Sequence, residues 1–148
     1  MPRIISSSIS GPVVLGPSDD PLLITSTGTV TSTGSADGID GGSGTTWTIA
    51  NAGIVAASGG NGIALGGPGI VSNTGSISGL DGLDLRAGGS VMNFSGGSIS
   101  GVGTSGSGIF ITGGAGSVTN YGSIAGASHI GVLISAGGTV TNAKPRSW

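Results

Sequence analysis

The strongest constraint on the fold of this 148-residue chain is a block of sequence that repeats. Residues 117–126 read Ser-Val-Thr-Asn-Tyr-Gly-Ser-Ile-Ala-Gly, and residues 70–79 read Ile-Val-Ser-Asn-Thr-Gly-Ser-Ile-Ser-Gly. Val, Asn, Gly, Ile and Gly occupy the same offsets in both segments. Self-similarity at a period of roughly 20–50 residues is typical of solenoids and related arrays, in which each repeat buries its apolar face against the next.

One position of the block marks each repeat. It holds Ser in a first copy and Asn in later copies, at Ser26, Asn51, Asn73, Asn93, Asn120 and Asn142, with spacings of 25, 22, 20, 27 and 22 residues. A second segment, Gly-[Ile/Leu/Val]-x-[Leu/Ile], completes the unit, as at 62–65 and 108–111. These spacings predict about six coils of 20–27 residues over residues 9–142. We expect one domain over 1–148, with a non-repeat tail at 143–148.

The alternation of residue types predicts strands rather than helices. Val118, Asn120, Gly122 and Ile124 occupy alternate positions of the chain, so their side chains should all point to the same side, into the interior of the fold. The chain has 34 Gly and only 7% charged residues, and it contains no Glu. Gly pairs such as Gly88-Gly89 indicate corners that need a positive φ or a close approach of the backbone. The expected fold class is all-β, a parallel β-helix (β-solenoid).

The five Asn residues at the marker position allow a structural and a functional interpretation. In the structural one, which we favour, each inward amide binds the amide of the next coil or caps a turn in the left-handed region. In the functional one, the amides form a row of ligand-binding groups. A structural Asn ladder is therefore predicted at Asn51, Asn73, Asn93, Asn120 and Asn142.

The repeat resembles that of bacterial autotransporter passenger domains. The similarity lies in Val-x-Asn-x-Gly-x-Ile-x-Gly, followed by Gly-[Ile/Leu]-x-[Leu/Ile]-x-x-Gly-Gly, and it covers residues 9–142. It implies a right-handed parallel β-helix, an extracellular or bacterial cell-surface location, and a fragment of a longer passenger. The N-terminal segment lacks the apolar run of a signal peptide. Passengers include adhesins, proteases and inert stalks, so the resemblance implies no single activity.

A search for catalytic groups gives one weak candidate. Asp40 and Asp84 occupy equivalent positions two coils apart with Ala64 between them, a separation of roughly 10 Å at the usual strand spacing. Paired carboxylates at such a distance can hydrolyse or cleave a polysaccharide. Asp37 and Asp81 also match each other. We favour the simpler interpretation, in which the Asp side chains are solvated turn residues and the protein is not an enzyme.

Other ligand classes find little support. No basic stripe is available for nucleic acid, and no segment approaches the roughly 20 apolar residues that insert into a membrane. The segment 79–85 faintly resembles a calcium repeat, but the Asp residues do not recur in every coil. His129, the only histidine, should be a corner residue. We therefore expect no metal and no cofactor.

The irregular parts of the repeat are the candidates for partner binding. They are the insertions at 95–96 and 102–106 and an outward apolar pair, Phe110 and Leu133, which form a possible contact surface for a host surface or glycan. Both ends of a solenoid expose strand edges unless they are capped, which predicts end-to-end self-association into filaments. The leading prediction is a non-enzymatic stalk or adhesin-like segment; the alternatives are a polysaccharide-active enzyme and a self-assembling filament subunit.

Overall fold

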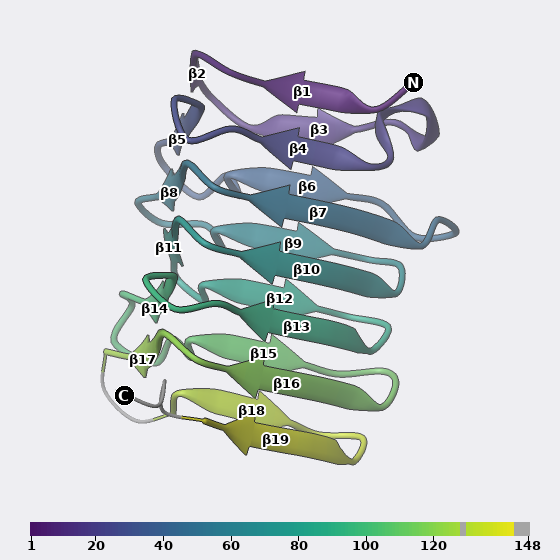
Figure 1. Ribbon diagram of the computed structural model, residues 1–148, viewed down its shortest axis with the longest axis vertical. Helices are drawn as coiled ribbons and strands as arrows, with labels where there is room; N and C mark the ends of the chain where they lie inside the picture. The colour runs from purple at the N-terminus through teal and green to yellow at the C-terminus, as the bar shows by residue number, and fades with distance from the viewer. Residues whose placement is uncertain (128–129, 144–148) are drawn as a thin grey trace, which may run out of the picture.

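Three parallel β-sheets form the walls of a β-solenoid with about six turns (Figure 1). The computed structural model describes residues 1–127 and 130–143. Each turn passes once through every sheet, so neighbours in a sheet come from successive turns and all pairs are parallel. The predicted parallel β-solenoid is confirmed.

The first sheet, sheet A, has seven strands in the order β1-β4-β7-β10-β13-β16-β19, and sheets B and C have six each. The strands of sheet A are β1 (Arg3–Ile5), β4 (Leu22–Ile24), β7 (Trp47–Asn51), β10 (Gly69–Asn73), β13 (Gly89–Asn93), β16 (Gly116–Asn120) and β19 (Gly138–Asn142). Those of sheet B are β2 (Ser8–Ser10), β5 (Thr29–Ser32), β8 (Ile54–Ala57), β11 (Ser76–Gly79), β14 (Ser98–Gly101) and β17 (Ser123–Gly126). Those of sheet C are β3 (Val13–Leu15), β6 (Ile39–Gly41), β9 (Ile63–Leu65), β12 (Leu83–Leu85), β15 (Ile109–Ile111) and β18 (Val132–Ile134), and one short 3-10 turn, η1 (Pro17–Asp19), precedes β4.

The pairing of strands in sheet A shows that the repeat begins earlier in the chain than the sequence predicted. Asn51 pairs with Ile24, and Ile24 pairs with Ile5, so Ser26 is not the first member of the marker column. The coils begin at Arg3 rather than near residue 9. The sequence search missed the first coils because an apolar side chain occupies the column there and no Asn marks the register.

Aliphatic side chains of the three sheets fill the interior. Val30, Val55, Ile77 and Ile99 of sheet B are each 0% exposed and stack in one column from coil to coil. Burial of such side chains is the main favourable contribution to folding, at about 25 cal/mol per Å² of apolar surface. The predicted inward parity of the marker block is confirmed by this column.

One coil replaces the usual corner packing with a tryptophan. Gly69 lies so close to Leu65 that an added Cβ would be 2.9 Å from a Leu65 methyl. In the preceding coil Gly41 takes the place of Leu65, and Trp47 takes the place of Gly69. The Trp47 ring is 2% exposed, lies 2.9 Å from where a Gly41 Cβ would be, and donates from Nε1 to the Gly42 carbonyl at 2.7 Å. The two changes compensate each other in volume.

The corners between strands contain both the left-handed glycines and the variation in coil length. The turns into sheet A use Gly in the left-handed region, at Gly88 (φ 77°), Gly113 (φ 67°) and Gly137 (φ 84°), as the Gly pairs predicted. The insertions at 95–96 and 102–106 lie between strands, so the ladders on either side keep their register. Coil length therefore varies without any strand slipping.

Candidate functional site

The predicted Asn ladder is a continuous chain of side-chain hydrogen bonds. Each Nδ2 donates to the Oδ1 of the next Asn along the axis: Asn51 to Asn73 at 2.8 Å, Asn73 to Asn93 at 2.9 Å, Asn93 to Asn120 at 2.8 Å, and Asn120 to Asn142 at 2.8 Å. All the donors point toward the C-terminal end. The ladder thus has a direction, and its last amide belongs to the last described coil.

Four of the five amides, those of Asn51, Asn73, Asn93 and Asn120, also bind the backbone at the corner between sheets A and B. The Nδ2 of Asn73 reaches the carbonyl of Gly75 at 3.1 Å and that of Ser98 at 3.2 Å. No non-Gly residue among those described has a positive φ, so the Asn residues do not cap turns in the left-handed region. Asn73 and Asn93 are 0% exposed. Because coil stacking uses their polar atoms, these buried amides are not available to a ligand.

A second polar ladder runs along the corner between sheets B and C. A side-chain oxygen of one coil accepts from the backbone N–H of the equivalent residue in the next coil. The pairs are Asp37 Oδ1 with Asn61 N at 2.7 Å, Asn61 Oδ1 with Asp81 N at 3.1 Å, and Asp81 Oδ1 with Ser107 N at 2.6 Å. Asp37 and Asp81 lie between strands and are partly exposed, as expected of turn residues, and one carboxylate oxygen of each also binds the next coil. The signal was a polar residue before each Gly of the second segment, including Asn61 and Ser107.

The outer face of sheet C holds the candidate carboxylates. The register places Asp40, Ala64, Asp84, Phe110 and Leu133 in one column, as the repeat predicted, and adds Val14 at its N-terminal end. Asp40 and Asp84 are two coils apart with Ala64 between them. The middle of this column is not solvated, however: Ala64 is 0% and Asp84 7% exposed. The expectation that the Asp84 side chain is solvated is thus wrong.

Asp84 is covered by partners that the sequence did not reveal. Arg86 Nε donates to Asp84 Oδ2 at 2.8 Å, and Asn61 Nδ2 donates to the same oxygen at 3.2 Å. Burial raises the pKa of Asp84, and the hydrogen bond and charge of Arg86 oppose that shift without cancelling it. The hydrogen bond to Asp84 in turn raises the pKa of Arg86. A carboxyl with a raised pKa therefore lies on this face, where the sequence indicated none.

The predicted apolar pair lies at the C-terminal end of the same column. Phe110 of β15 pairs in register with Leu133 of β18, and both side chains point outward by parity. Leu133 is 37% exposed and Phe110 is half-buried. The two residues are therefore neighbours on the surface, and their role as a contact surface stays a prediction.

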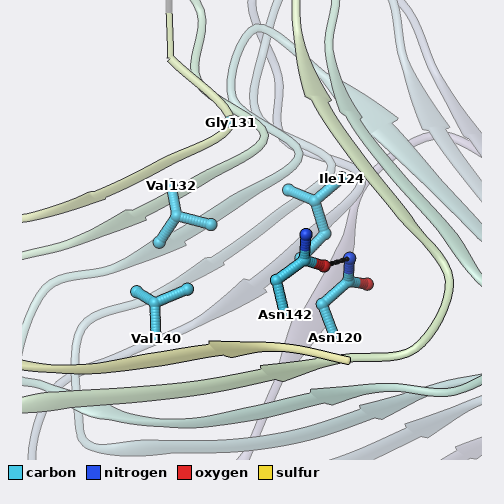
Figure 2. A pocket seen from close by; sticks show the side chains of 6 residues that line it. All are labelled: Asn120, Ile124, Gly131, Val132, Val140 and Asn142. Atoms are coloured by element: carbon cyan, nitrogen blue, oxygen red, sulfur yellow. Dashed lines mark hydrogen bonds between the residues drawn. The ribbon is translucent and has the colours of Figure 1, made fainter. Parts of the chain in front are cut away.

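The C-terminal end of the solenoid contains a hollow of about 250 Å³. It is lined by Asn120, Ile124, Gly131, Val132, Val140 and Asn142, which lie between the end of β16 and the end of β19. Figure 2 shows the side chains of Val132, Val140 and Ile124 around the space, beside the hydrogen bond between Asn120 and Asn142. This hollow lies in the interior of the solenoid, beside the last described strand.

The remaining candidates give no site. Among residues 1–127 and 130–143, no group of His and Asp side chains is arranged to hold a metal ion. His129 lies outside the described residues, as do residues 144–148 of the predicted tail. No helix in the described part of the chain is long and apolar enough to cross a membrane. Comparison with protein-family models, with curated proteins and with solved structures gave no match.

Proposed function

We propose that this chain is a non-enzymatic structural β-solenoid, a stalk or adhesin-like segment of an extracellular or bacterial cell-surface protein. The observation that supports the proposal is that the repeated polar residues form hydrogen bonds between successive coils. Asn51 through Asn142 form one ladder, and Asp37 through Ser107 form a second. Repeats that contact mainly their neighbours along the axis form a stiff rod, as in other quasi-one-dimensional proteins.

The distribution of charge agrees with this role. The outward positions of sheet B are Ser8, Ser10, Thr29, Thr31, Ile54, Ala56, Ser76, Ser78, Ser98, Ser100, Ser123 and Ala125, with no charged residue among them. Nucleic acid requires a basic surface, and the net charge of the chain is −2. A neutral, hydroxyl-rich face suits contact with a neutral partner such as a glycan. A host surface or a glycan is accordingly the proposed partner class.

The stalk role is tested by measuring whether the chain holds its ends at a fixed separation. The chain has no cysteine, so spin labels can be attached at Ser8→Cys and Ser123→Cys on the outer face of sheet B. Five coil steps separate these positions, which corresponds to about 24 Å at about 4.8 Å per step. A narrow distance distribution near that value supports a stiff rod. A broad distribution contradicts the proposal.

The adhesin role is tested on glycan arrays and on cells. The double substitution Phe110→Ser and Leu133→Ser removes the apolar pair of sheet C, and Ser90→Ala on the outer face of sheet A is the matched control. Binding by the wild-type chain and by the control, with loss in the double variant, assigns adhesion to this surface. If no variant and no wild-type sample binds, the stalk role alone remains.

A polysaccharide-active enzyme is the second candidate, because burial shifts the pKa of Asp84 upward, the direction that favours a general acid. Asp40 is the second carboxylate of that hypothesis, two coils away. Turnover on a panel of acidic and neutral glycans, abolished by Asp84→Asn and unaffected by Ser90→Ala on sheet A, would establish it. Absence of turnover across the panel leaves the structural role as the proposal.

A further inference from the structure

Two exposed aromatic side chains share one corner of the solenoid. Of the aromatic residues in the described part of the chain, Trp47 is buried and Phe110 half-buried, whereas Phe94 and Tyr121 are each 39% exposed. Phe94 follows β13 and Tyr121 follows β16, so both lie where sheet A passes into sheet B (Figure 1). The backbone N–H of each donates at 2.8 Å to the carbonyl of the marker Asn in the preceding coil. The two rings therefore occupy the same position of successive coils, about 4.8 Å apart along the axis.

The fold does not require an aromatic residue at this position. Ala52, Thr74 and Ala143 occupy it in other coils and make the same backbone hydrogen bond to the preceding coil, at 2.8 Å. Apolar surface that stays in water adds nothing to the burial that stabilises a fold. Thr74 and Ala143 also flank the pair on either side along the axis, so both rings lie between described coils. Their exposure is a property of the outer corner and not of an end of the solenoid.

A third apolar side chain extends this surface. Met92 is 41% exposed and points outward from β13, two positions before Phe94. Its column in sheet A holds small or hydroxyl-bearing side chains in β7, β10 and β16. Single apolar residues are common on protein surfaces, whereas a group of neighbouring ones indicates a contact surface. Met92, Phe94 and Tyr121 are called the aromatic corner below.

The two-residue insertion at 95–96 holds the aromatic corner in place. Gly97 N donates to the Phe94 carbonyl at 2.9 Å, and Gly96, at the third position of this turn, has φ 85°. A positive φ at that position is typical of a defined β-turn, which fixes the backbone that carries Phe94. A Cβ added at Gly122 would collide with the Phe94 carbonyl oxygen, so the backbone beneath the two rings is closely packed. A surface preorganised in this way loses little conformational freedom when it binds.

Hydroxyl groups surround the aromatic corner, and charges do not. Thr74, Ser95 and Ser123 lie in the same coils as the rings or in the preceding one, and all three are exposed. Residues 62–80 and 87–127, which form these coils, contain charged side chains at no position. A charged ligand would lose hydration here without meeting an opposite charge. A sugar ring presents an apolar C–H face to an aromatic ring and hydroxyls to serine and threonine, which can donate and accept.

We propose that the aromatic corner is a binding site for a neutral saccharide, with sugar rings stacked on Phe94 and Tyr121 and their hydroxyls bound by the neighbouring serine and threonine side chains. Aromatic residues supply rigid contact area at a small cost in side-chain entropy, and Tyr121 adds a polar group at its tip. The inference rests on the adhesin role proposed above, for which it places the glycan here instead of at Phe110 and Leu133. It does not depend on the stalk role.

Binding to immobilised oligosaccharides tests the site. The probes are neutral gluco-, galacto- and manno-oligosaccharides, with sulfated and uronate-containing oligosaccharides as the charged comparison. Phe94→Ala and Tyr121→Ala introduce the residue that Ala52 and Ala143 place at the same corner, so the double variant should fold. We expect the wild-type chain to bind a neutral oligosaccharide and the double variant to bind it about ten-fold more weakly or worse. The double variant of Phe110→Ser and Leu133→Ser should bind as the wild type does.

Conservative variants separate ring stacking from general apolar contact. Tyr121→Phe keeps the ring and should retain binding, whereas Phe94→Leu keeps an apolar side chain without the ring face and should weaken binding as Phe94→Ala does. The ring-proton NMR signals of Phe94 and Tyr121 should shift on titration with the bound oligosaccharide, and those of Phe110 should not.

Three outcomes would overturn the site. Loss of binding in the Phe110 and Leu133 variant, with none in the Phe94 and Tyr121 variant, keeps the adhesin role and refutes the aromatic corner. Binding confined to the charged oligosaccharides refutes the neutral ligand. Failure of the wild-type chain to bind any probe refutes both the site and the adhesin role.

Discussion

A carboxamide at the inward corner position can accept from the coil behind it and donate to the coil ahead, as Asn73 does with Asn51 and Asn93. Asn73→Ala would leave the buried Nδ2 of Asn51 and the buried Oδ1 of Asn93 without these partners. We expect a loss of about 1–3 kcal/mol in the free energy of unfolding, as is usual when buried polar groups lose their hydrogen bonds. Urea unfolding followed by circular dichroism measures it.

The neighbouring Ser72 provides the control for this prediction. It points to the outer face and makes one long contact, 3.5 Å from its hydroxyl to the Ile49 carbonyl. Ser72→Ala should stay within about 0.5 kcal/mol of wild type. Equal stability losses for Asn73→Ala and Ser72→Ala would show that the ladder adds nothing beyond burial.

Asp84 makes stability depend on pH. Burial raises its pKa in the folded state above the unfolded value of 3.8, so the folded state binds the proton more tightly. The contribution of this group to stability is therefore greatest below the unfolded pKa and is lost as pH rises through the folded pKa. Asp84→Asn should remove that part of the pH dependence while keeping an acceptor for Arg86. Unfolding curves collected between pH 3 and 7 test this, and a wild-type slope in the variant would contradict it.

Side-chain packing couples two residues that occupy different positions of the repeat, Gly41 and Trp47. Gly41 and Trp47 replace the leucine and glycine of the following coil, Leu65 and Gly69. Trp47→Gly alone should cost about 3–5 kcal/mol by leaving a cavity. Gly41→Leu alone should cost about 1–3 kcal/mol through collision with the indole. The double variant restores the common packing, so it should lose at least about 1 kcal/mol less than the two single losses combined. Additive losses in urea unfolding would contradict this coupling.

The sequence predicted the strands and their register in every coil that has Asn at the marker position. Five Asn residues at one offset predicted both the register and the ladder, because each amide must meet its copy in the next coil. The prediction failed at Ser26, because Ile24 and Ile5 occupy the column in the first coils and leave no polar marker. Burial of Asp84 was missed because it depends on Arg86 and Asn61, whose reach across the sheet is a property of packing.

At the scale of the whole molecule, the charged residues are segregated. Those described are Arg3, Asp19, Asp20, Asp37, Asp40, Asp81, Asp84 and Arg86, which lie near the N-terminal end or on and beside sheet C. The outer face of sheet B and the last described coil have none. Among the described residues, charge is thus concentrated near the N-terminal end and around sheet C. This distribution agrees with the proposed neutral partner for the outer face of sheet B.

Nearest-neighbour stacking also predicts that the solenoid opens from one end. In repeat proteins each coil is stabilised only by the coils beside it, and local openings begin where neighbours are fewest. Hydrogen exchange should therefore be fastest in β17, β18 and β19, in which no residue is buried, and slowest in the central strands β8 to β13. Uniform exchange along the chain would contradict end-opening.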